Sequence, residues 1–307
     1  LWVVHPLQTE SVTYVVQRAE SLMGLFYLLT LYCFIRGTES PARGWQALAV
    51  VACGLGMATK EVMVSAPLMV WLYDRTFVAG TFGGAMRQRW RVYAGLGGSW
   101  VLLAYLVVQA GELGSERAGF HATVAWGSYG LTQIWAVGHY LWLSVWPHPL
   151  VFDYGTLLVT GGAQVVPAAL MVILLVMGTT VSLWRWPAMG FVGCWFFGIL
   201  GPTSSVLPLA GQTVAEHRMY LPLAAVVAVV VLGIYAWLGR RSVGMLLVLA
   251  VVLGRLTLGR NEDYRSEVAL WSDTVAKQAD NSRAHNNLGV ALFRKDQTPE
   301  AVEQFER

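Results

Sequence analysis

The sequence predicts an all-α protein in two parts: a polytopic bundle of transmembrane helices over residues 1–260 and a polar helical segment over 261–307. Three observations predict it. Hydrophobic residues make up 56% of the 307 residues and charged residues only 13%, against about 25% charged residues in soluble domains. Apolar runs recur along the first part, as in membrane proteins with several spans. Polar residues with helical periodicity follow only after Arg260.

Nine apolar runs are predicted to form helices, although several are shorter than the roughly 20 residues that a helix needs to cross a bilayer. The three cysteines lie inside these runs, and we interpret them as small buried hydrophobic residues rather than as disulfide or metal pairs. In chain order the predicted helices are 21–35, 45–58, 62–77, 92–110, 122–146, 164–183, 188–207, 220–238 and 243–259.

Arginine placement orients these helices, because cytoplasmic loops carry an excess of Lys and Arg. Residues 1–20, the turn at Lys60–Glu61, the segment 202–219 and the tail from Arg260 are therefore expected to face away from the cytoplasm. The connections that we assign to the cytoplasm contain Arg36 and Arg43, then Arg75, Arg87, Arg89 and Arg91, and finally Arg240 and Arg241.

The predicted helix 122–146 conflicts with this assignment if it spans the membrane, because the loop around Arg87 and the loop at Arg240 would then lie on opposite sides. Its composition is also unusual for a span. It is rich in tryptophan and contains Thr132, Gln133 and His139. We favour a helix that lies in the membrane interface or re-enters the same side, which restores the charge rule, and a full span is the alternative.

The tail has the pattern of a helical repeat. Its apolar residues share one helix face, and several of them match positions of a tetratricopeptide repeat, where small residues lie at helix contacts and large ones fill the space between. One such repeat cannot bury its own face, so further repeats are expected beyond Arg307, in a number that the sequence leaves open. The residues of the shared face are Ala284, Leu288, Ala291 and Leu292, and those that match the repeat are Asn287, Leu288, Gly289, Leu292, Ala301 and Phe305.

Ionisable residues beside apolar runs are the candidate site, because charge is costly near a membrane and usually marks a function. Arginine suits bidentate phosphate binding and lysine supplies a compact positive charge, while carboxylates could orient an acceptor or bind a metal. The alternative is that the arginines only reach lipid headgroups and the glutamates only solvate loops. The candidates are Glu10, Arg18, Glu20, Lys60, Glu61, Glu216, His217 and Arg218.

Other chemistry has little support in the sequence. No Gly-rich phosphate loop, GxSxG or HExxH motif is present, and the histidines lack metal-ligand spacing. No protein metal site is therefore predicted, although a requirement for a divalent metal stays open. The formal net charge of +3 is small, and membrane lipid rather than nucleic acid is the expected surrounding.

Four segments carry a resemblance to a known family. HPLQTESVTYVVQRAESLMGLFYLL resembles the HPxxTE…R(A/K)(E/D) segment of the transmembrane and tetratricopeptide repeat-containing proteins, which belong to the membrane O-mannosyltransferases with a glycosyltransferase C fold. ATKEVMVSAPLMVWLYD, YLWLSVWPHPLVFDYGT and PTSSVLPLAGQTVAEHRMYLP are similar to later segments of the same family, in the same order, and AHNNLG follows in the tail. The resemblance covers nearly the whole chain.

This resemblance implies an enzyme that transfers mannose or another sugar from a polyprenyl-phosphate donor to protein Ser or Thr hydroxyls, with the acceptor protein held by the repeats. It places the main catalytic carboxylate upstream of Leu1. It also implies that Glu10, Glu20, Glu61 and Glu216 take part in catalysis by orienting the donor sugar or the basic residues. The carrier phosphate would be held by Arg18, Lys60, His217 and Arg218, and which of the last two contacts it stays open.

Two alternatives differ in class: a non-catalytic membrane-anchored repeat scaffold or adaptor, and a transporter or channel. The transporter predicts charged residues deep inside the spans, where the sequence has few. The bias towards Ala, Val, Gly and Arg indicates a GC-rich bacterial genome. It favours a bacterial inner membrane with a periplasmic site and repeats, and an endoplasmic reticulum membrane is the other location considered. Sugar, carrier, acceptor and oligomeric state are not fixed by the sequence.

Overall fold

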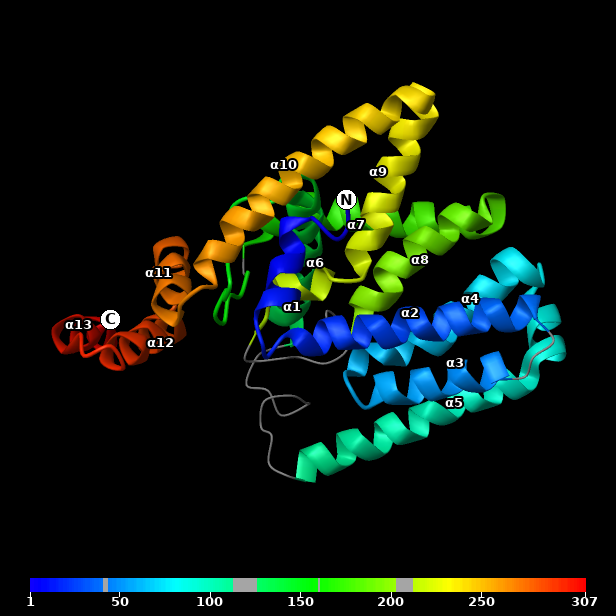
Figure 1. The fold of residues 1–307 in the computed structure, drawn as a ribbon, viewed down its shortest axis with the longest axis horizontal. Helices are drawn as coiled ribbons and strands as arrows, with labels where there is room; N and C mark the ends of the chain where they lie inside the picture. The colour runs from blue at the N-terminus through cyan, green and yellow to red at the C-terminus, as the bar shows by residue number, and fades with distance from the viewer. Residues whose placement is uncertain (41–43, 113–125, 160, 203–211) are drawn as a thin grey trace.

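The structure is a computed structural model that describes residues 1–40, 44–112, 126–159, 161–202 and 212–307 (Figure 1). The described residues are helical, as the sequence predicts. Short helices begin the chain, longer helices form its body, and three amphipathic helices end it. The elements are η1 (Pro6–Gln8), α1 (Thr9–Thr13), α2 (Arg18–Glu39), α3 (Gly44–Met57), η2 (Glu61–Ser65), α4 (Ala66–Tyr73), η3 (Asp74–Val78), α5 (Phe82–Glu112), α6 (Trp126–Val145), α7 (Gly162–Arg185), α8 (Pro187–Gly201), η5 (Glu216–Met219), α9 (Pro222–Leu238), η6 (Gly239–Arg241), α10 (Ser242–Asp263), α11 (Glu267–Lys277), α12 (Ser282–Phe293) and α13 (Thr298–Glu306).

Four helical segments of the described chain are long and apolar enough to cross a membrane: Arg18–Glu39, Phe82–Gln109, Gly162–Arg185 and Pro222–Asp263. The last one turns back on itself at η6 and forms the α9–α10 hairpin (Figure 1). Leu174 and Trp237 are among many large apolar side chains on these helices that stay exposed. An apolar surface of this extent is unfavourable in water and fits lipid, so the helices indicate an integral membrane protein.

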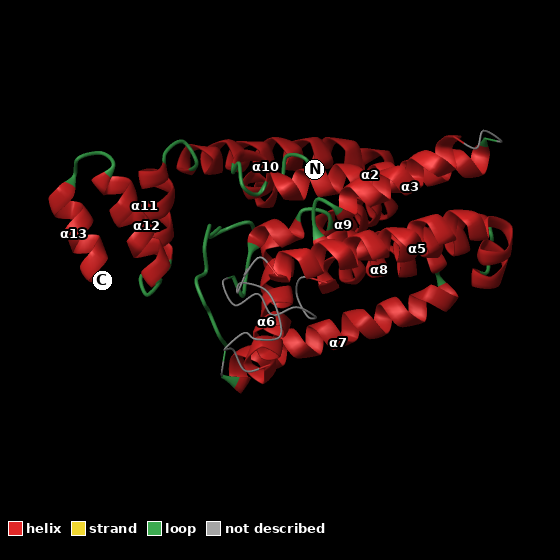
Figure 2. Ribbon diagram, turned by 90° about the horizontal axis from the view of Figure 1, so that it is seen from below, coloured by secondary structure: helices red, strands yellow, loops and turns green. Residues whose placement is uncertain are grey.

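Helix α6 differs in direction from most of the long helices. The helices α2, α3, α5, α7 and α8 run along the long axis of the molecule, whereas α6 crosses their ends on the side of the tail (Figures 1 and 2). It is not among the segments apolar enough to span. This arrangement is consistent with the expected helix in the membrane interface, and it brings the end of α5 and the start of α7 to the same end of the bundle.

Two predicted elements are wrong in their extent. The run 62–77 is not one helix, because a 3₁₀ turn, α4 and a π-helix at Asp74–Val78 follow one another there. Helix α5 starts at Phe82 rather than at residue 92, and Arg89 interrupts its backbone with φ −131° and ψ 28°. The Arg89 guanidinium turns to the buried Asp74 carboxylate, at 2.9 and 3.0 Å from its two oxygens. This ion pair forms at the kink, where a short helix meets the longer helix that the sequence predicts.

The main core lies between α2, α3, α4, α6 and α8, around Tyr27, Phe34, Met63 and Trp195. The tail has a separate small core, in which Leu288, Leu292 and Ala301 are buried against Val268, Trp271 and Val275. The helix face predicted for the tail is therefore buried. Gly289 also lies at the contact of α12 with α13, because a Cβ atom there would be 2.6 Å from the Phe305 ring. These helices form a single compact unit, and a repeat array stays a prediction.

Candidate functional site

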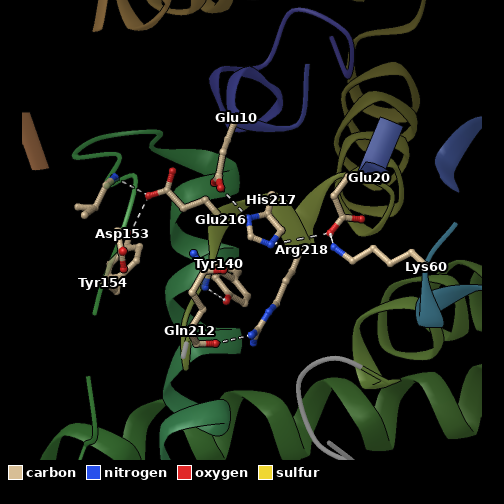
Figure 3. A network of polar contacts seen from close by, with 12 residues as sticks. Glu10, Glu20, Lys60, Tyr140, Asp153, Tyr154, Gln212, Glu216, His217 and Arg218 are labelled. Atoms are coloured by element: carbon tan, nitrogen blue, oxygen red, sulfur yellow. Dashed lines mark hydrogen bonds and ion pairs between the residues drawn. The ribbon is translucent and has the colours of Figure 1, made fainter. Parts of the chain in front are cut away.

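The predicted charged residues come from four separate elements that end on the same side of the bundle as the tail (Figures 1 and 2). Glu10 lies on α1, Glu20 in the first turn of α2, and Lys60 at the turn between α3 and η2. Helix η5, which leads into α9, supplies the remaining three. We call Glu10, Glu20, Lys60, Glu216, His217 and Arg218 the polar cluster (Figure 3).

His217 lies between two glutamates of the polar cluster. Its Nδ1 atom is 2.7 Å from the Glu10 carboxylate, and its Nε2 atom is 3.9 Å from Glu20. Because a carboxylate only accepts hydrogen bonds, Nδ1 carries the proton in this arrangement. Glu20 also pairs with the Lys60 ammonium. The result is a continuous chain from Glu10 through His217 and Glu20 to Lys60, in which both glutamates are buried (Figure 3).

Glu216 points the opposite way, to the segment between α6 and α7, which we call the 147–159 loop (Figure 3). Its Oε1 atom accepts hydrogen bonds from the Val151 backbone N–H at 2.7 Å and from the Tyr154 hydroxyl at 2.8 Å. Burial raises the pKa of Glu216 to about 8; the contacts with Val151, Arg260 and Tyr154 oppose that rise, and Glu10 adds to it. The carboxyl group is therefore mostly protonated at neutral pH.

Arg218 is the buried cation of the polar cluster that has no carboxylate partner among the described residues. The residue is 6% exposed, and its guanidinium donates to neutral oxygens only: the Thr213 carbonyl at 3.1 Å, the Gln212 carbonyl at 2.6 Å and the Gln133 side chain at 3.4 Å. A buried charge without a counter-charge is costly. It is therefore a place where an anion would be stabilised.

Two predicted residues do not join the polar cluster. Arg18 is exposed in the first turn of α2, and the described residues offer its side chain no hydrogen bond or ion pair. Glu61 is half-buried in η2, again without an ion pair in the described part of the chain. Tyr14, which precedes Arg18 by four residues, does not share a helix with it, because Tyr14 follows α1 in an extended conformation. The roles of Arg18 and Glu61 stay predictions.

The structure adds supporting residues that the sequence did not single out for a role. Tyr140 on α6 holds the backbone of η5, because its hydroxyl accepts from the Ala215 N–H at 2.8 Å. Tyr154 donates to Glu216 and accepts from His139 Nε2 at 2.9 Å. Gln133 donates to the Thr213 carbonyl at 2.8 Å. A signal existed for Gln133 and His139, since polar residues are unusual in an otherwise apolar helix.

The chemistry that the polar cluster offers is acid–base and electrostatic. Among the described residues no group of three or more His, Cys, Asp or Glu side chains is arranged to bind a metal ion. A buried guanidinium, a lysine and a histidine lie instead next to buried carboxyl groups, at the end of membrane helices. Such a set can bind an anionic group of a membrane lipid and stabilise negative charge that develops on it.

Comparison with known proteins gives one distant match over the full chain. The sequence is 20% identical over 329 residues to the protein O-mannosyl-transferase F38B6.6 of Caenorhabditis elegans. The match covers 99% of this chain and 44% of the relative, so the chain spans less than half of that protein's length. No protein-family model and no solved structure matches the sequence. The chain is thus similar to a protein O-mannosyl-transferase across the whole bundle and the tail.

Proposed function

We propose that the protein is an integral membrane glycosyltransferase that moves mannose or another sugar from a polyprenyl-phosphate donor to Ser or Thr hydroxyls of proteins on the non-cytoplasmic side. The observation that carries the proposal is the buried Arg218, whose charge has no carboxylate partner among the described residues. The distant similarity to a protein O-mannosyl-transferase supports the same class of reaction.

In the proposed reaction the carrier phosphate is the leaving group. The bond between the sugar and the phosphate breaks, the phosphate gains negative charge, and the acceptor oxygen bonds to the sugar. Arg218 and Lys60 offset the charge on the phosphate, which is the usual role of preorganised cations in such transfers. Glu10 and Glu20 fix the His217 ring from its two nitrogen atoms, so that the ring is held beside Arg218 where the donor would bind. A carboxylate removes the proton of the acceptor hydroxyl as the new bond forms.

Transfer of labelled mannose from a polyprenyl-phosphate donor to acceptor proteins by the purified full-length protein tests this proposal. Arg218→Gln should lower kcat by about 100-fold or more, which is typical for the loss of one charge-stabilising donor. Arg240→Gln removes an exposed arginine at the α9–α10 turn, away from the polar cluster (Figure 1), and should leave kcat unchanged. Equal activity of Arg218→Gln and wild type would contradict the proposal.

The scaffold is the second candidate, and the tail is the observation that favours it. Phe293, Val302 and Phe305 are exposed on α12 and α13, which suits contact with further repeats or with a partner protein. A pure scaffold predicts no sugar transfer by wild type with any polyprenyl-phosphate donor, and normal partner binding by Arg218→Gln. Measurement of sugar transfer by wild type and of partner binding by Arg218→Gln therefore separates the candidates.

A further inference from the structure

The tail is attached to the bundle through a small number of polar contacts with the 147–159 loop. The Asn281 amide donates to the Asp153 carbonyl at 2.9 Å, and the Arg283 guanidinium lies 2.6 Å from the Asp153 carboxylate. The Lys277 ammonium donates to the Leu150 carbonyl at 2.9 Å. Two consecutive elements of the tail, the end of α11 and the start of α12, therefore hold the same face of the loop.

Aromatic packing adds to this attachment. The Phe152 ring contacts the Trp271 ring of α11 at a centroid distance of 5.1 Å and the Tyr264 ring at 5.9 Å. On its other side it contacts Tyr14, which follows α1, at 4.9 Å. Phe152 is therefore shared by the tail and by the segment that carries Glu10.

The opposite face of the loop holds the polar cluster. Val151 and Tyr154, which flank Phe152 and Asp153 in sequence, both donate to Glu216. Further along the loop, the Leu157 carbonyl accepts from the Thr213 hydroxyl at 2.7 Å. One short loop thus contacts the tail through Asp153 and the segment preceding α9 through its neighbours, with no other layer of residues between.

We propose that the tail is a positioning element of the site: by holding Asp153 it fixes the 147–159 loop, and the loop fixes Glu216 together with the adjacent His217 and Arg218. Asp153, Asn281 and Arg283 are then positioning residues, which act on the site through Tyr154 and Val151. The part of this inference that concerns activity rests on the proposed function, whereas the part that concerns order in residues 212–219 does not.

The contact should be sensitive to single changes, because it is not closed by a continuous apolar interface. A cavity of about 350 Å³ lies between the loop and the tail, bounded by Tyr154 to Leu157 on one side and by Gln278 and Asp280 to Arg283 on the other. Gly155 allows the close approach. Its φ is +63°, and a Cβ atom there would lie 3.1 Å from Asn281.

Hydrogen–deuterium exchange of the full-length protein tests the coupling without any activity assay. The double variant Asn281→Ser/Arg283→Met keeps a residue that caps α12 but removes both donors to Asp153. Amide exchange should become about tenfold faster or more in residues 147–159 and also in 212–219, as expected when hydrogen bonds to a charged group are lost. Unchanged exchange in 212–219 would overturn the proposal, whether or not the loop itself exchanges faster.

Two matched variants control for damage to the tail itself. Arg294→Met removes an exposed arginine that pairs with Glu267 inside the tail and should change exchange in neither segment. Gly155→Ala loosens the contact from the side of the loop, and it should reproduce the faster exchange in 212–219 while α12 and α13 stay protected. If Gly155→Ala leaves 212–219 unchanged, the proposal fails even where the double variant had an effect.

Hydrolysis of the polyprenyl-phosphate sugar in the absence of acceptor supplies the functional readout. A tail that only holds the acceptor would leave this hydrolysis unchanged in the double variant. If the tail positions the site, the double variant should hydrolyse the donor with a kcat about tenfold lower than wild type and with little change in KM for the donor. Arg283→Lys, which keeps a positive charge near Asp153, should retain part of the wild-type kcat. If wild type transfers no sugar, the proposed function fails, while the exchange experiment still decides whether the tail orders the site.

Discussion

The Glu20–Lys60 ion pair removes two charges from water at the start of α2. The Glu20 side chain is 2% exposed and the Lys60 side chain 17% exposed. The two charges are therefore favourable only together, because removal of one partner leaves the other buried and unpaired. This pair ties α2 to the turn that follows α3.

We therefore expect stability and activity to respond differently at this pair. Lys60→Met should lower the free energy of unfolding by roughly 3 kcal/mol, the lower end for a broken buried pair, since Lys60 retains some exposure. The double variant Lys60→Met/Glu20→Gln should regain most of that stability in chemical unfolding experiments. Sugar transfer should stay low in both variants, because both lack the cation. Full transfer by the double variant would show that Lys60 has only a structural role.

The raised pKa of Glu216 predicts how stability depends on pH. A carboxyl group with a pKa of about 8 in the folded state and about 4.5 in the unfolded state binds its proton more tightly when folded. The contribution of Glu216 to the free energy of unfolding is fully present below about pH 4.5, falls as the pH rises towards 8, and no longer changes above that range.

Glu216→Gln should remove this contribution while it keeps an acceptor for Val151 and Tyr154. Thermal unfolding between pH 5.5 and 8.5 should show wild-type Tm falling by several degrees and the Glu216→Gln variant falling less. Glu267→Gln changes an exposed glutamate of α11 and serves as the control, with the same pH dependence as wild type. An identical fall in the Glu216→Gln variant would contradict the buried protonated state.

At the scale of elements, the contact between α7 and α8 depends on a glycine. A Cβ atom at Gly190 would lie 2.6 Å from the Leu183 backbone nitrogen and 2.7 Å from its Cα. The backbone cannot rotate away as a side chain could, so the two helices would have to separate at this turn.

Gly190→Ala should therefore lower Tm, although alanine is the better helix former. Gly233→Ala in α9, where a Cβ atom meets nothing within 4 Å, should leave Tm unchanged or raise it, since replacing glycine inside a helix stabilises by roughly 0.5–1 kcal/mol. Thermal unfolding of both variants in the same detergent checks that Tm falls for Gly190→Ala and does not fall for Gly233→Ala. A rise in Tm for Gly190→Ala would show that α7 and α8 pack more loosely than their backbones indicate.

Hydrophobic runs predicted the helices well where burial and length decide the structure. The runs that became α2, α3, α7, α9 and α10 agree with the structure to within a few residues. The run 62–77 failed because apolar composition does not distinguish an α-helix from a 3₁₀ turn or a π-helix. The start of α5 was missed because the short helix before the kink at Arg89 has a glycine-containing, charged sequence that looks like a loop.

The site was predictable in part for a physical reason. Charge next to apolar runs identified Glu10, Glu20, Lys60 and His217, which the structure brings into one chain of contacts. The same signal cannot tell that Arg18 is exposed and Arg218 is buried. Their burial depends on how distant parts of the chain fold against each other. The partners of Glu216 lie more than 60 residues away in an irregular loop, where no local pattern gives their direction.

For the whole molecule, the two ends differ in charge and in chemistry. Arg240 and Arg241 lie at the α9–α10 turn, at the top of Figure 1, and further arginines lie around the start of α5, at its right edge, so both groups are away from the tail. The other end carries the polar cluster, α6 and the tail (Figures 1 and 2). If α6 lies across the bundle rather than through it, the positive-inside rule assigns both groups of arginines to the cytoplasmic side, as the sequence predicts.

This arrangement predicts the side of the membrane on which each part is accessible. In a variant whose native cysteines are replaced by alanine, single cysteines at Gln88 and Arg240, both exposed, should react with an impermeant maleimide only from the cytoplasmic side. A cysteine at Ser272 in α11, also exposed, should react only from the opposite side. If α6 spanned the membrane, the cysteines at Gln88 and Arg240 would be labelled from different sides of the membrane. Labelling of all three positions from one side would contradict the orientation of the tail, and with it the place proposed for the acceptor protein.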